Sequence, residues 1–341
     1  MVYRIAWMKG DGIGEEISEV ALEAVKAIED ATKLRFDISF YDIGDACKER
    51  RGEALPQETV SGIKGADAAI KGPVGETAAE TIIKLRQTLD LYANLRPVRN
   101  YAGVPCVRPM DILIVRENTE DLYKGWEFPT EGAVISLRLI SELASSRVAR
   151  VAADYARARK GKITIVHKAN VMKMSDGLFR RTAREEIDRA GNITVDEMYV
   201  DAMSMALIRN PEDYDVILTT NMFGDILSDE AAQVAGGLGF APSANVGERA
   251  ALFEPAHGSA PDIAGKGIAN PYSMVLSLGM MIYWLGSKRA DAEALKVSGI
   301  IDEAVGKMTG EGFLTRDAGG THSSREIANK LKSSLVELLE R

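Results

Sequence analysis

Three arginines stand close to the ends of predicted helices and strands, where polar side chains can reach a ligand. On a helix, Ile82, Ile83 and Arg86 fall on one face; Arg96 follows, and Arg116 ends the apolar run DILIV. A guanidinium binds a carboxylate through two parallel hydrogen bonds. The three arginines could therefore form a receptor for substrate carboxylates, although their spacing alone favours three surface salt bridges.

Two aspartates, Asp225 and Asp229, are four residues apart at the start of a helix predicted from about Gly224. Their carboxylates share one face, and such hard oxygen ligands suit Mg²⁺ or Mn²⁺. The simpler explanation is that acidic residues favour the first turn of a helix because of its dipole. A metal site would need a third carboxylate, which Asp201 could supply if it lies close in space.

Lys168 directly follows the apolar strand predicted at 163–166. Ligands of α/β folds bind at the carboxyl ends of strands, so this lysine is a candidate base with a tuned pKa, although most lysines are solvated charges. Further on, the stretch from Phe253 to Pro271 crowds small residues around His257. That loop is long enough to wrap a flat ligand.

The stretch Gly10–Gly14 (GDGIG) follows a strand and opens a helix, as a dinucleotide fingerprint would. However, the third glycine of GxGxxG would fall at Glu15, and Glu15 and Glu16 put negative charge where a pyrophosphate would bind. We therefore predict a tight strand-to-helix turn and no Rossmann fingerprint.

Short apolar runs alternate with longer amphipathic stretches, which is typical of an α/β protein. Strands are expected at 3–8, 35–41, 66–71, 111–115, 163–166 and 215–219, with helices from about 17, at 77–89, at 141–159, through 179–189, from about 224 and near the C-terminus. The segment 121–138 ends in the alternating AVISLRL and fits this rhythm poorly. We expect either a β-ribbon arm that pairs with another subunit or a simple surface hairpin.

Composition excludes several classes of protein. The 341 residues carry a formal net charge of −8, which argues against a uniformly basic nucleic-acid surface. No uncharged apolar run reaches the ~18 residues of a membrane helix, and the N-terminus does not resemble a signal peptide. Cys47 and Cys106 indicate neither a disulfide framework nor a thiolate metal site. A cytoplasmic location is expected.

Five motifs and their order carry a family resemblance: LDLYANLRP, VRENTEDLY, HKANVMK, NMFGDILSDEAA and FEPAHGSAPDIAGKGIANP. Together they resemble the β-decarboxylating dehydrogenases of the isocitrate/3-isopropylmalate family, from residue 10 to the TRDAGG stretch at 315–320. The resemblance implies an isopropylmalate dehydrogenase-like two-domain α/β fold with a mixed sheet, not a Rossmann fold. It also implies a domain of 1–96 plus 237–341 on the cofactor side, and a central domain of 97–236 with dimerisation helices and an arm near 121–140.

The resemblance also assigns roles to residues. It implies that Arg86, Arg96 and Arg116 hold the substrate carboxylates and that Tyr123 is the general acid. The dimer of this family is obligatory. Each site would therefore take two residues from the partner subunit, namely Lys168, the key residue of the base region, and Asp201. Asp225 and Asp229 would complete the metal site with Asp201. The partners implied are a hydroxy-diacid substrate and a second copy of the chain, in a homodimer or a tetramer.

For the cofactor, the resemblance implies that the adenosine half is held by His257, Gly258, Ser259, Ala260, Pro261, Asp262, Ile263 and Asn270. Family members that use NADP resemble each other in a Lys and a Tyr at the positions of Asp262 and Ile263. An aspartate can accept hydrogen bonds from ribose hydroxyls and would repel a 2′-phosphate. The expected cofactors are therefore NAD and Mg²⁺ or Mn²⁺.

The expected substrate follows from the same comparison. Isocitrate enzymes resemble one another in a Ser and an Asn at the positions of Glu80 and Ile82, and homoisocitrate enzymes tend to carry an Arg at the position of Ile83. The Ile82–Ile83 pair suits a branched alkyl group, because a carboxylate there would be desolvated without a partner. We expect oxidation of (2R,3S)-3-isopropylmalate to 2-oxoisocaproate, as in leucine biosynthesis. An NAD-dependent isocitrate or homoisocitrate dehydrogenase is the alternative.

A further alternative is a non-catalytic regulatory subunit of the same ancestry. Such a subunit would be expected to have lost some of Tyr123, Lys168 and the three aspartates, and all five are present. The sequence therefore favours an enzyme. Lys168 would act as a base only if the nearby arginines and metal lower its pKa.

Overall fold

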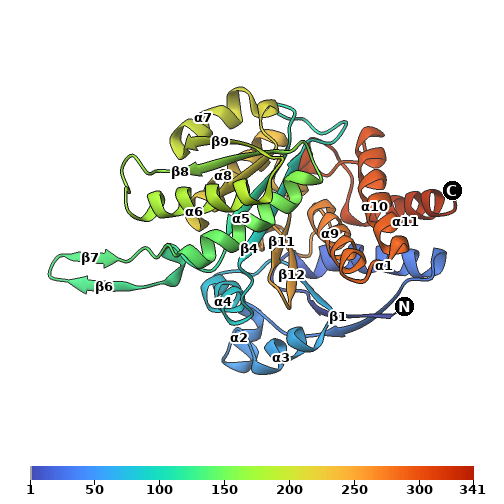
Figure 1. Ribbon diagram of the computed structural model, residues 1–341. Helices are drawn as coiled ribbons and strands as arrows, with labels where there is room; N and C mark the ends of the chain where they lie inside the picture. Colours follow the sequence, from blue (N-terminus) through green and yellow to red (C-terminus); the bar gives the residue numbers. More distant parts are fainter. Residues whose placement is uncertain (1) are drawn as a thin grey trace.

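A ten-stranded mixed sheet runs through the molecule in the computed structural model, which describes residues 2–341 (Figure 1). The strand order is β2-β1-β3-β12-β11-β4-β5-β10-β8-β9. Pairing is parallel except around β4 and β11, where β4 runs antiparallel to both neighbours and β11 runs antiparallel to β12. The strands are β1 (Val2–Met8), β2 (Arg35–Phe40), β3 (Ala68–Lys71), β4 (Ala93–Arg99), β5 (Asp111–Glu117), β8 (Lys162–His167), β9 (Thr194–Tyr199), β10 (Val216–Thr219), β11 (Pro242–Val246) and β12 (Ala251–Pro255).

Helices pack on the sheet and bury their apolar faces, as the alternating pattern predicts. In α1, for example, Ile17, Val20, Ala21, Ala24 and Val25 are buried at the helical spacing noted in the sequence. The helices are α1 (Gly14–Ala31), α2 (Asp45–Arg51), α3 (Gln57–Gly65), α4 (Lys84–Thr88), α5 (Glu142–Arg157), α6 (Ser175–Ala190), α7 (Val200–Arg209), α8 (Asn221–Ala235), α9 (Tyr272–Arg289), α10 (Ala292–Gly310) and α11 (Ser324–Leu339). Within residues 2–341, none of them is long and apolar enough to cross a bilayer.

The strands expected from apolar runs are present, whereas β4, β9, β11 and β12 were not expected. Strand β4 contains Asn94, Arg96 and Pro97, so it lacks an apolar run like the one that marked its neighbour β5. Its two edges join β11 on one side and β5 on the other. Strand β4 thus links the predicted part 97–236 with the part made of both chain ends; those boundaries stay a prediction.

The GDGIG stretch forms the predicted tight turn between β1 and α1. Gly12 has φ +56°, and a Cβ there would lie 2.0 Å from the carbonyl oxygen of Ser259. The amide of Ile13 donates to that same oxygen at 2.9 Å. The turn therefore packs directly against the loop that follows β12.

The helix predicted over 77–89 is built from a π-helical turn, η1 (Ala79–Ile83), followed by α4. The extra residue of a π turn changes the face that the helix buries. Ile82 lies in the hydrophobic core and Arg86 is buried, but Ile83 is only partly buried. The prediction that these three share one face is therefore only partly confirmed.

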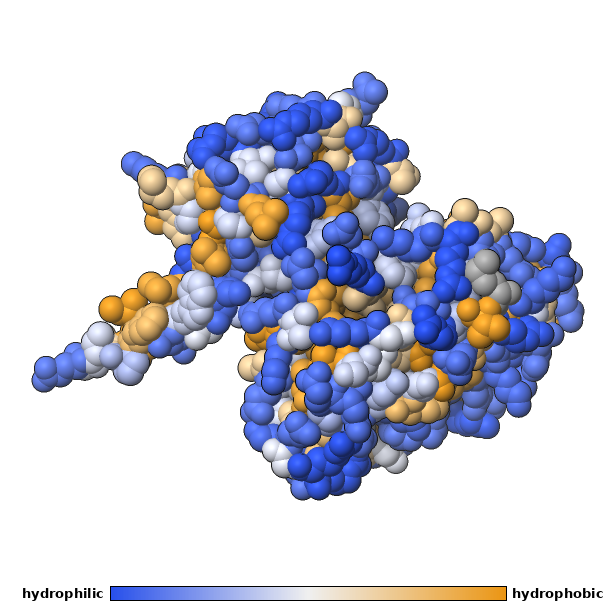
Figure 2. Space-filling model, turned by 60° about the horizontal axis from the view of Figure 1, so that its bottom comes forward, coloured by the Kyte–Doolittle hydropathy of each residue, from blue (hydrophilic) through white to orange (hydrophobic). Residues whose placement is uncertain are grey.

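A two-stranded antiparallel ribbon of β6 (Glu127–Thr130) and β7 (Ala133–Ser136) projects from the body of the molecule (Figure 1, left). All eight strand residues are exposed, and Val134 and Ile135 are 64% and 51% exposed. Figure 2 shows apolar residues along this projecting arm. An exposed apolar ribbon is marginal in water, and its pairing with another subunit stays a prediction.

Candidate active site

The three arginines singled out in the sequence are buried, at 7%, 7% and 0% exposure for Arg86, Arg96 and Arg116. The alternative of three surface salt bridges is therefore wrong. Arg86 comes from α4, Arg96 from β4 and Arg116 from β5, and Arg86 and Arg96 lie close enough to Arg116 to lower its pKa. Three positive charges gathered in the interior need anionic partners.

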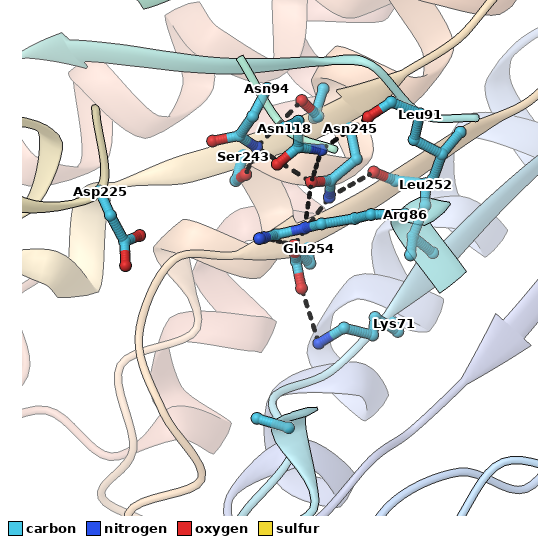
Figure 3. A network of polar contacts seen from close by, with 12 residues as sticks. Lys71, Arg86, Leu91, Asn94, Asn118, Asp225, Ser243, Asn245, Leu252 and Glu254 are labelled. Atoms are coloured by element: carbon cyan, nitrogen blue, oxygen red, sulfur yellow. Dashed lines mark hydrogen bonds and ion pairs between the residues drawn. The ribbon is translucent and has the colours of Figure 1, made fainter. Parts of the chain in front are cut away.

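Arg86 is held by a polar network in the centre of the sheet (Figure 3). Its Nε donates to Asn245 Oδ1 at 3.0 Å, and its Nη2 lies 3.4 Å from Glu254 Oε1. Asn245 Oδ1 also accepts from Asn94 and Asn118. Figure 3 shows the guanidinium extending from α4 toward the side on which Asp225 lies. The network thus fixes the direction of Arg86.

Glu254 at the centre of this network also pairs with Lys71, at 2.7 Å between Nζ and Oε2. Burial alone would raise the pKa of Glu254, but the charges of Lys71 and Arg86 outweigh it and lower that pKa to about 2. The sequence pattern did not single out Lys71, Asn245 or Glu254. A charged side chain inside a short apolar strand, in AAIK and ALFEP, could have indicated Lys71 and Glu254.

The metal-site candidates lie against the other two arginines. Arg116 Nη1 forms an ion pair with Asp225, and Arg96 Nη1 lies 3.2 Å from Asp229 Oδ1. Helix α8 begins at Asn221, so neither aspartate belongs to its first turn. The helix-dipole explanation is therefore wrong: the helix begins earlier than predicted, and Asn221 instead accepts from Arg116.

Tyr123 completes this cluster. Its hydroxyl donates to Asp225, and its ring lies 5.0 Å from the guanidinium carbon of Arg116. It stands on the short 3₁₀ turn η2 (Leu122–Lys124), whose Tyr123 carbonyl accepts from Gln87 Nε2 at 3.1 Å. The elements that carry Arg86, Tyr123 and Asp225 are thus tied together.

Burial and neighbouring charges shift the pKa values of Asp225, Arg116 and Tyr123. Burial alone would raise the pKa of Asp225, but Arg116 and the Tyr123 hydroxyl outweigh it and hold that pKa below its usual range. Burial, with the nearby positive charges, lowers the pKa of Arg116 to about 10. Burial raises the pKa of Tyr123 to about 12. At neutral pH Tyr123 therefore keeps a proton that it can donate.

Lys168 and Asp201 lie apart from this cluster and pair with each other. Lys168 follows β8, and Asp201 lies in the first turn of α7. Within residues 2–341 there is no group of three His, Cys, Asp or Glu side chains placed to hold a metal ion. A single chain therefore brings Asp225 and Asp229 together but not Asp201.

The loop after β12 contains the residues expected to hold the cofactor. Asp262 is exposed on the turn η5 (Pro261–Ile263), and Ala260 just before it has φ +40°. Among residues 2–341, the buried Nε2 of His257 has no hydrogen-bond partner. Asn270 is buried, where its amide donates to Asp317 Oδ2 at 2.9 Å. A buried imidazole nitrogen without a partner, in the same loop as an exposed aspartate, fits a nucleotide ligand that carries hydrogen-bonding groups.

Comparisons with known proteins show the family to which the chain belongs. The family model "Isocitrate/isopropylmalate dehydrogenase" matches residues 4–331. A 3-isopropylmalate dehydrogenase from Archaeoglobus fulgidus is 47% identical over 335 residues, which cover 97% of this chain and 99% of that protein. An isocitrate/homoisocitrate dehydrogenase from Thermus thermophilus is 40% identical over 346 residues, with 99% and 100% covered. The crystal structure of isocitrate dehydrogenase from Methylococcus capsulatus matches with a TM-score of 0.88 at 36% identity, covering 99% of this chain and all of that one.

Proposed function

The chain belongs to the isocitrate/isopropylmalate dehydrogenase family, and from that premise we propose that it oxidises and decarboxylates (2R,3S)-3-isopropylmalate with NAD. A divalent metal and NAD are general to the family. One observation carries the proposal above all: three buried guanidiniums converge beside the paired carboxylates of Asp225 and Asp229. Such a site matches a dianionic substrate that a metal ion also chelates.

The arginines hold the two carboxylates of the substrate. Arg86, Arg96 and Arg116 are pre-oriented by Asn245, Asn94 and Asn221, so little side-chain entropy is lost when a diacid binds. Because the guanidiniums are buried, each bidentate contact forms in a medium of low dielectric constant, where it is stronger than in water.

Ile83 selects the third substituent of the substrate. It lies three residues before Arg86 and is partly buried, whereas Ile82 packs into the core. Glu80 forms an exposed pair with Lys48 at 2.6 Å. An isopropyl group against Ile83 stays in an apolar environment, while a third carboxylate would be desolvated there without a partner. This supports isopropylmalate over isocitrate or homoisocitrate.

The metal would be Mg²⁺ or Mn²⁺, held by Asp225 and Asp229 together with the partner subunit's Asp201, because carboxylate oxygens are the donors these ions prefer. The residues after β12, with Asp262 facing solvent, would hold NAD and disfavour the 2′-phosphate of NADP. When bound, the metal supplies a Lewis acid at the substrate oxygens, and NAD supplies the hydride acceptor.

Two side chains of the protein move protons. Nζ of the partner subunit's Lys168 accepts the proton of the 2-hydroxyl while hydride leaves C2. The resulting β-keto acid loses the carboxylate on C3 as CO₂, and Tyr123 Oη donates its proton to C3. In one chain Lys168 pairs with Asp201. In a dimer it would instead lie near the arginines and the metal ion of the neighbouring site.

The surface of α7 and α8 supports such a dimer. Asp201, Met205 and Ile208 recur at helical spacing on α7, and Met205 and Ile208 are 65% and 51% exposed. On α8, Met222 and Ile226 are exposed beside the metal-site aspartates. If α7 of one subunit covers α8 of the other, the apolar residues are buried and the partner subunit's Asp201 approaches the metal site.

Mixing two inactive variants tests the shared site. The variants K168M and Y123F each impair every site of their own homodimer. After the two are unfolded and refolded together, half of the dimers are mixed, and each of these has one intact site only if Lys168 serves the partner. Recovery of about a quarter of the wild-type rate is expected. Recovery of no activity, with mixed dimers demonstrated by mass spectrometry, would contradict shared sites.

Initial rates test the substrate and the cofactor. We expect the highest kcat/KM with 3-isopropylmalate, NAD and Mg²⁺ or Mn²⁺, compared with isocitrate, homoisocitrate and malate, each also assayed with NADP. A higher kcat/KM with isocitrate or homoisocitrate would replace the proposed substrate with the alternative. A rate with NADP equal to that with NAD would refute the role of Asp262.

A further inference from the structure

Arg138 lies where the projecting ribbon returns to the body of the molecule, just after β7. Its Nε donates to Asp121 Oδ1 at 2.6 Å, and its Nη2 lies 3.2 Å from Asp121 Oδ2 and 3.0 Å from Thr220 Oγ1. Its Nη1 forms an ion pair with Asp176. The guanidinium carbon lies 5.2 Å from the ring centre of Phe223. One side chain thus contacts three segments of the chain that are far apart in sequence.

Asp121 connects Arg138 to the turn that carries Tyr123. It is fully buried and has φ +68°, a conformation that a non-glycine residue adopts only when its surroundings hold it. Its Oδ1 also accepts from the amide of Leu122 and caps η2. Its Oδ2 accepts from the amide of Met222, at the start of the helix that carries Asp225 and Asp229. The Asp121 carboxylate therefore links the turn of Tyr123 to the metal-site helix.

Asp176 connects Arg138 to Lys168. It is fully buried, and its Oδ2 accepts from the backbone amide of Lys168 at 2.6 Å. The two carboxylates of Asp121 and Asp176 share the single positive charge of Arg138, so loss of the guanidinium would leave both without a counter-ion in the interior.

We propose that Arg138 is a positioning residue for the reaction: its guanidinium sets the relative positions of the Tyr123 turn, the Lys168 loop and the start of α8. The inference rests on the function proposed above, which gives these elements their roles. Since Lys168 would serve the partner's site, Arg138 also connects the acid of one site to the base of the other.

Only an arginine has the geometry for this role. The planar fork directs Nε and Nη2 at one carboxylate and Nη1 at another, whereas a lysine ammonium is a point charge that cannot span both. Arg138→Lys therefore keeps the charge and loses the alignment. A displacement of about 1 Å at a catalytic group lowers a rate by about a hundredfold.

A matched control is available in Arg159. Its guanidinium also bridges two aspartates, Asp215 at 2.7 Å and Asp111 at 2.8 Å, and it contacts none of the candidate site residues named above. Arg159→Lys thus removes a comparable fork from a structural location. We expect both variants to unfold at lower denaturant concentration than the wild type. Only R138K should lose turnover, about 10- to 100-fold in kcat, with KM for the diacid little changed because the three substrate arginines do not contact Arg138.

A double-mutant cycle separates positioning from a general loss of structure. If Arg138 acts through Tyr123, the change R138K should cost much less in the Y123F background than in the wild type. The same should hold in the K168M background. If R138K folds poorly, the variant Asp176→Asn provides a second test. This change should lower kcat in the wild-type background and have little further effect on kcat in the K168M background.

Equal kcat values for R138K and R159K, or full additivity of R138K with both Y123F and K168M, would overturn the inference. The wild-type rate on the four hydroxy-diacids tests the proposed function separately. If the wild type is inactive on all of them, crystal structures of the wild type and R138K still decide: unchanged positions of Tyr123 and Lys168 would refute the positioning role, and displaced ones would support it.

Discussion

Replacing Glu254 with glutamine should destabilise the fold, because this carboxylate holds two buried cations. Lys71 is 2% exposed and lies 2.7 Å from Glu254, and Arg86 lies on the other side of the same carboxylate. The variant E254Q keeps the shape of the side chain and an oxygen that can accept from Asn245. It removes only the charge, so Lys71 is left without a counter-ion in the interior.

The magnitude follows from the pKa of the carboxyl. Lowering that pKa from its usual 4.5 to about 2 corresponds to about 3 kcal/mol of stabilisation by the charged form. Breaking a buried ion pair by removing one partner typically costs about 3–5 kcal/mol, which agrees. We therefore expect E254Q to lose about 3–5 kcal/mol of unfolding free energy at pH 7.

The pH dependence has a defined sign. A carboxyl whose pKa is lower in the folded protein stabilises it fully above its unfolded pKa, near 4.5, and this contribution is lost as the pH falls toward 2. By pH 3 about 2 kcal/mol of it should be gone. The difference in unfolding free energy between the wild type and E254Q should therefore become smaller between pH 5 and pH 3.

Guanidinium chloride unfolding followed by circular dichroism at pH 7, 5 and 3 measures both effects. Glu337→Gln is the control, since Glu337 forms an exposed pair with Lys307 and should leave the midpoint unchanged. The variant K71M and the double variant E254Q/K71M complete a double-mutant cycle. The double variant should lose less unfolding free energy than the sum of the losses of the two single variants. The reasoning is refuted if E254Q unfolds like E337Q, or if the gap stays constant down to pH 3.

Four further predictions concern activity. Ile83→Ala should lower kcat/KM for 3-isopropylmalate about 10-fold and leave that for malate, which lacks the alkyl group, nearly unchanged; equal losses for both would contradict the contact. Ile83→Arg should raise the ratio of homoisocitrate to isopropylmalate kcat/KM, and a constant ratio would show that this position does not select the substrate. Asp262→Lys should shift the NADP/NAD ratio of kcat/KM toward NADP at least about 10-fold, which initial rates measure at matched ionic strength. Tyr123→Phe should lower kcat about a hundredfold or more with KM little changed, because the hydroxyl acts on the reacting carbon and not in binding; an unchanged kcat would remove Tyr123 from the mechanism.

The three buried arginines of the site are paired with carboxylates of the chain itself. Arg96 and Arg116 meet Asp225 and Asp229, and Arg86 meets Glu254. If Asp225 and Asp229 hold the proposed metal ion, the substrate carboxylates would take their place as partners of the arginines. Glu254 does not face this exchange, because Lys71 and Asn245 hold it as well. It remains a fixed counter-charge beneath Arg86.

Most elements of the fold can be predicted from the order of apolar and polar residues, because a strand or helix buried on a known face imposes its own period. The exceptions have physical causes. Strand β4 places Asn94 and Arg96 in the centre of the sheet, where only partners from β11 and α8 make polar side chains tolerable. The π turn before α4 buries Thr81 and Ile82, and no local pattern indicates it.

For the site, motifs and their residue types were enough to indicate the family, the arginines, the aspartates and the tyrosine. The motifs do not show which of these side chains are buried, which of them pair with one another, or how far apart they lie. That Arg86 rests on Glu254 and Lys71, or that Arg138 joins Asp121 to Asp176, depends on segments far apart in the chain that meet only when the sheet is assembled. Local sequence sets which groups can carry charge and which faces are apolar; the folded chain decides which charges meet away from water, and that decides how strongly they interact.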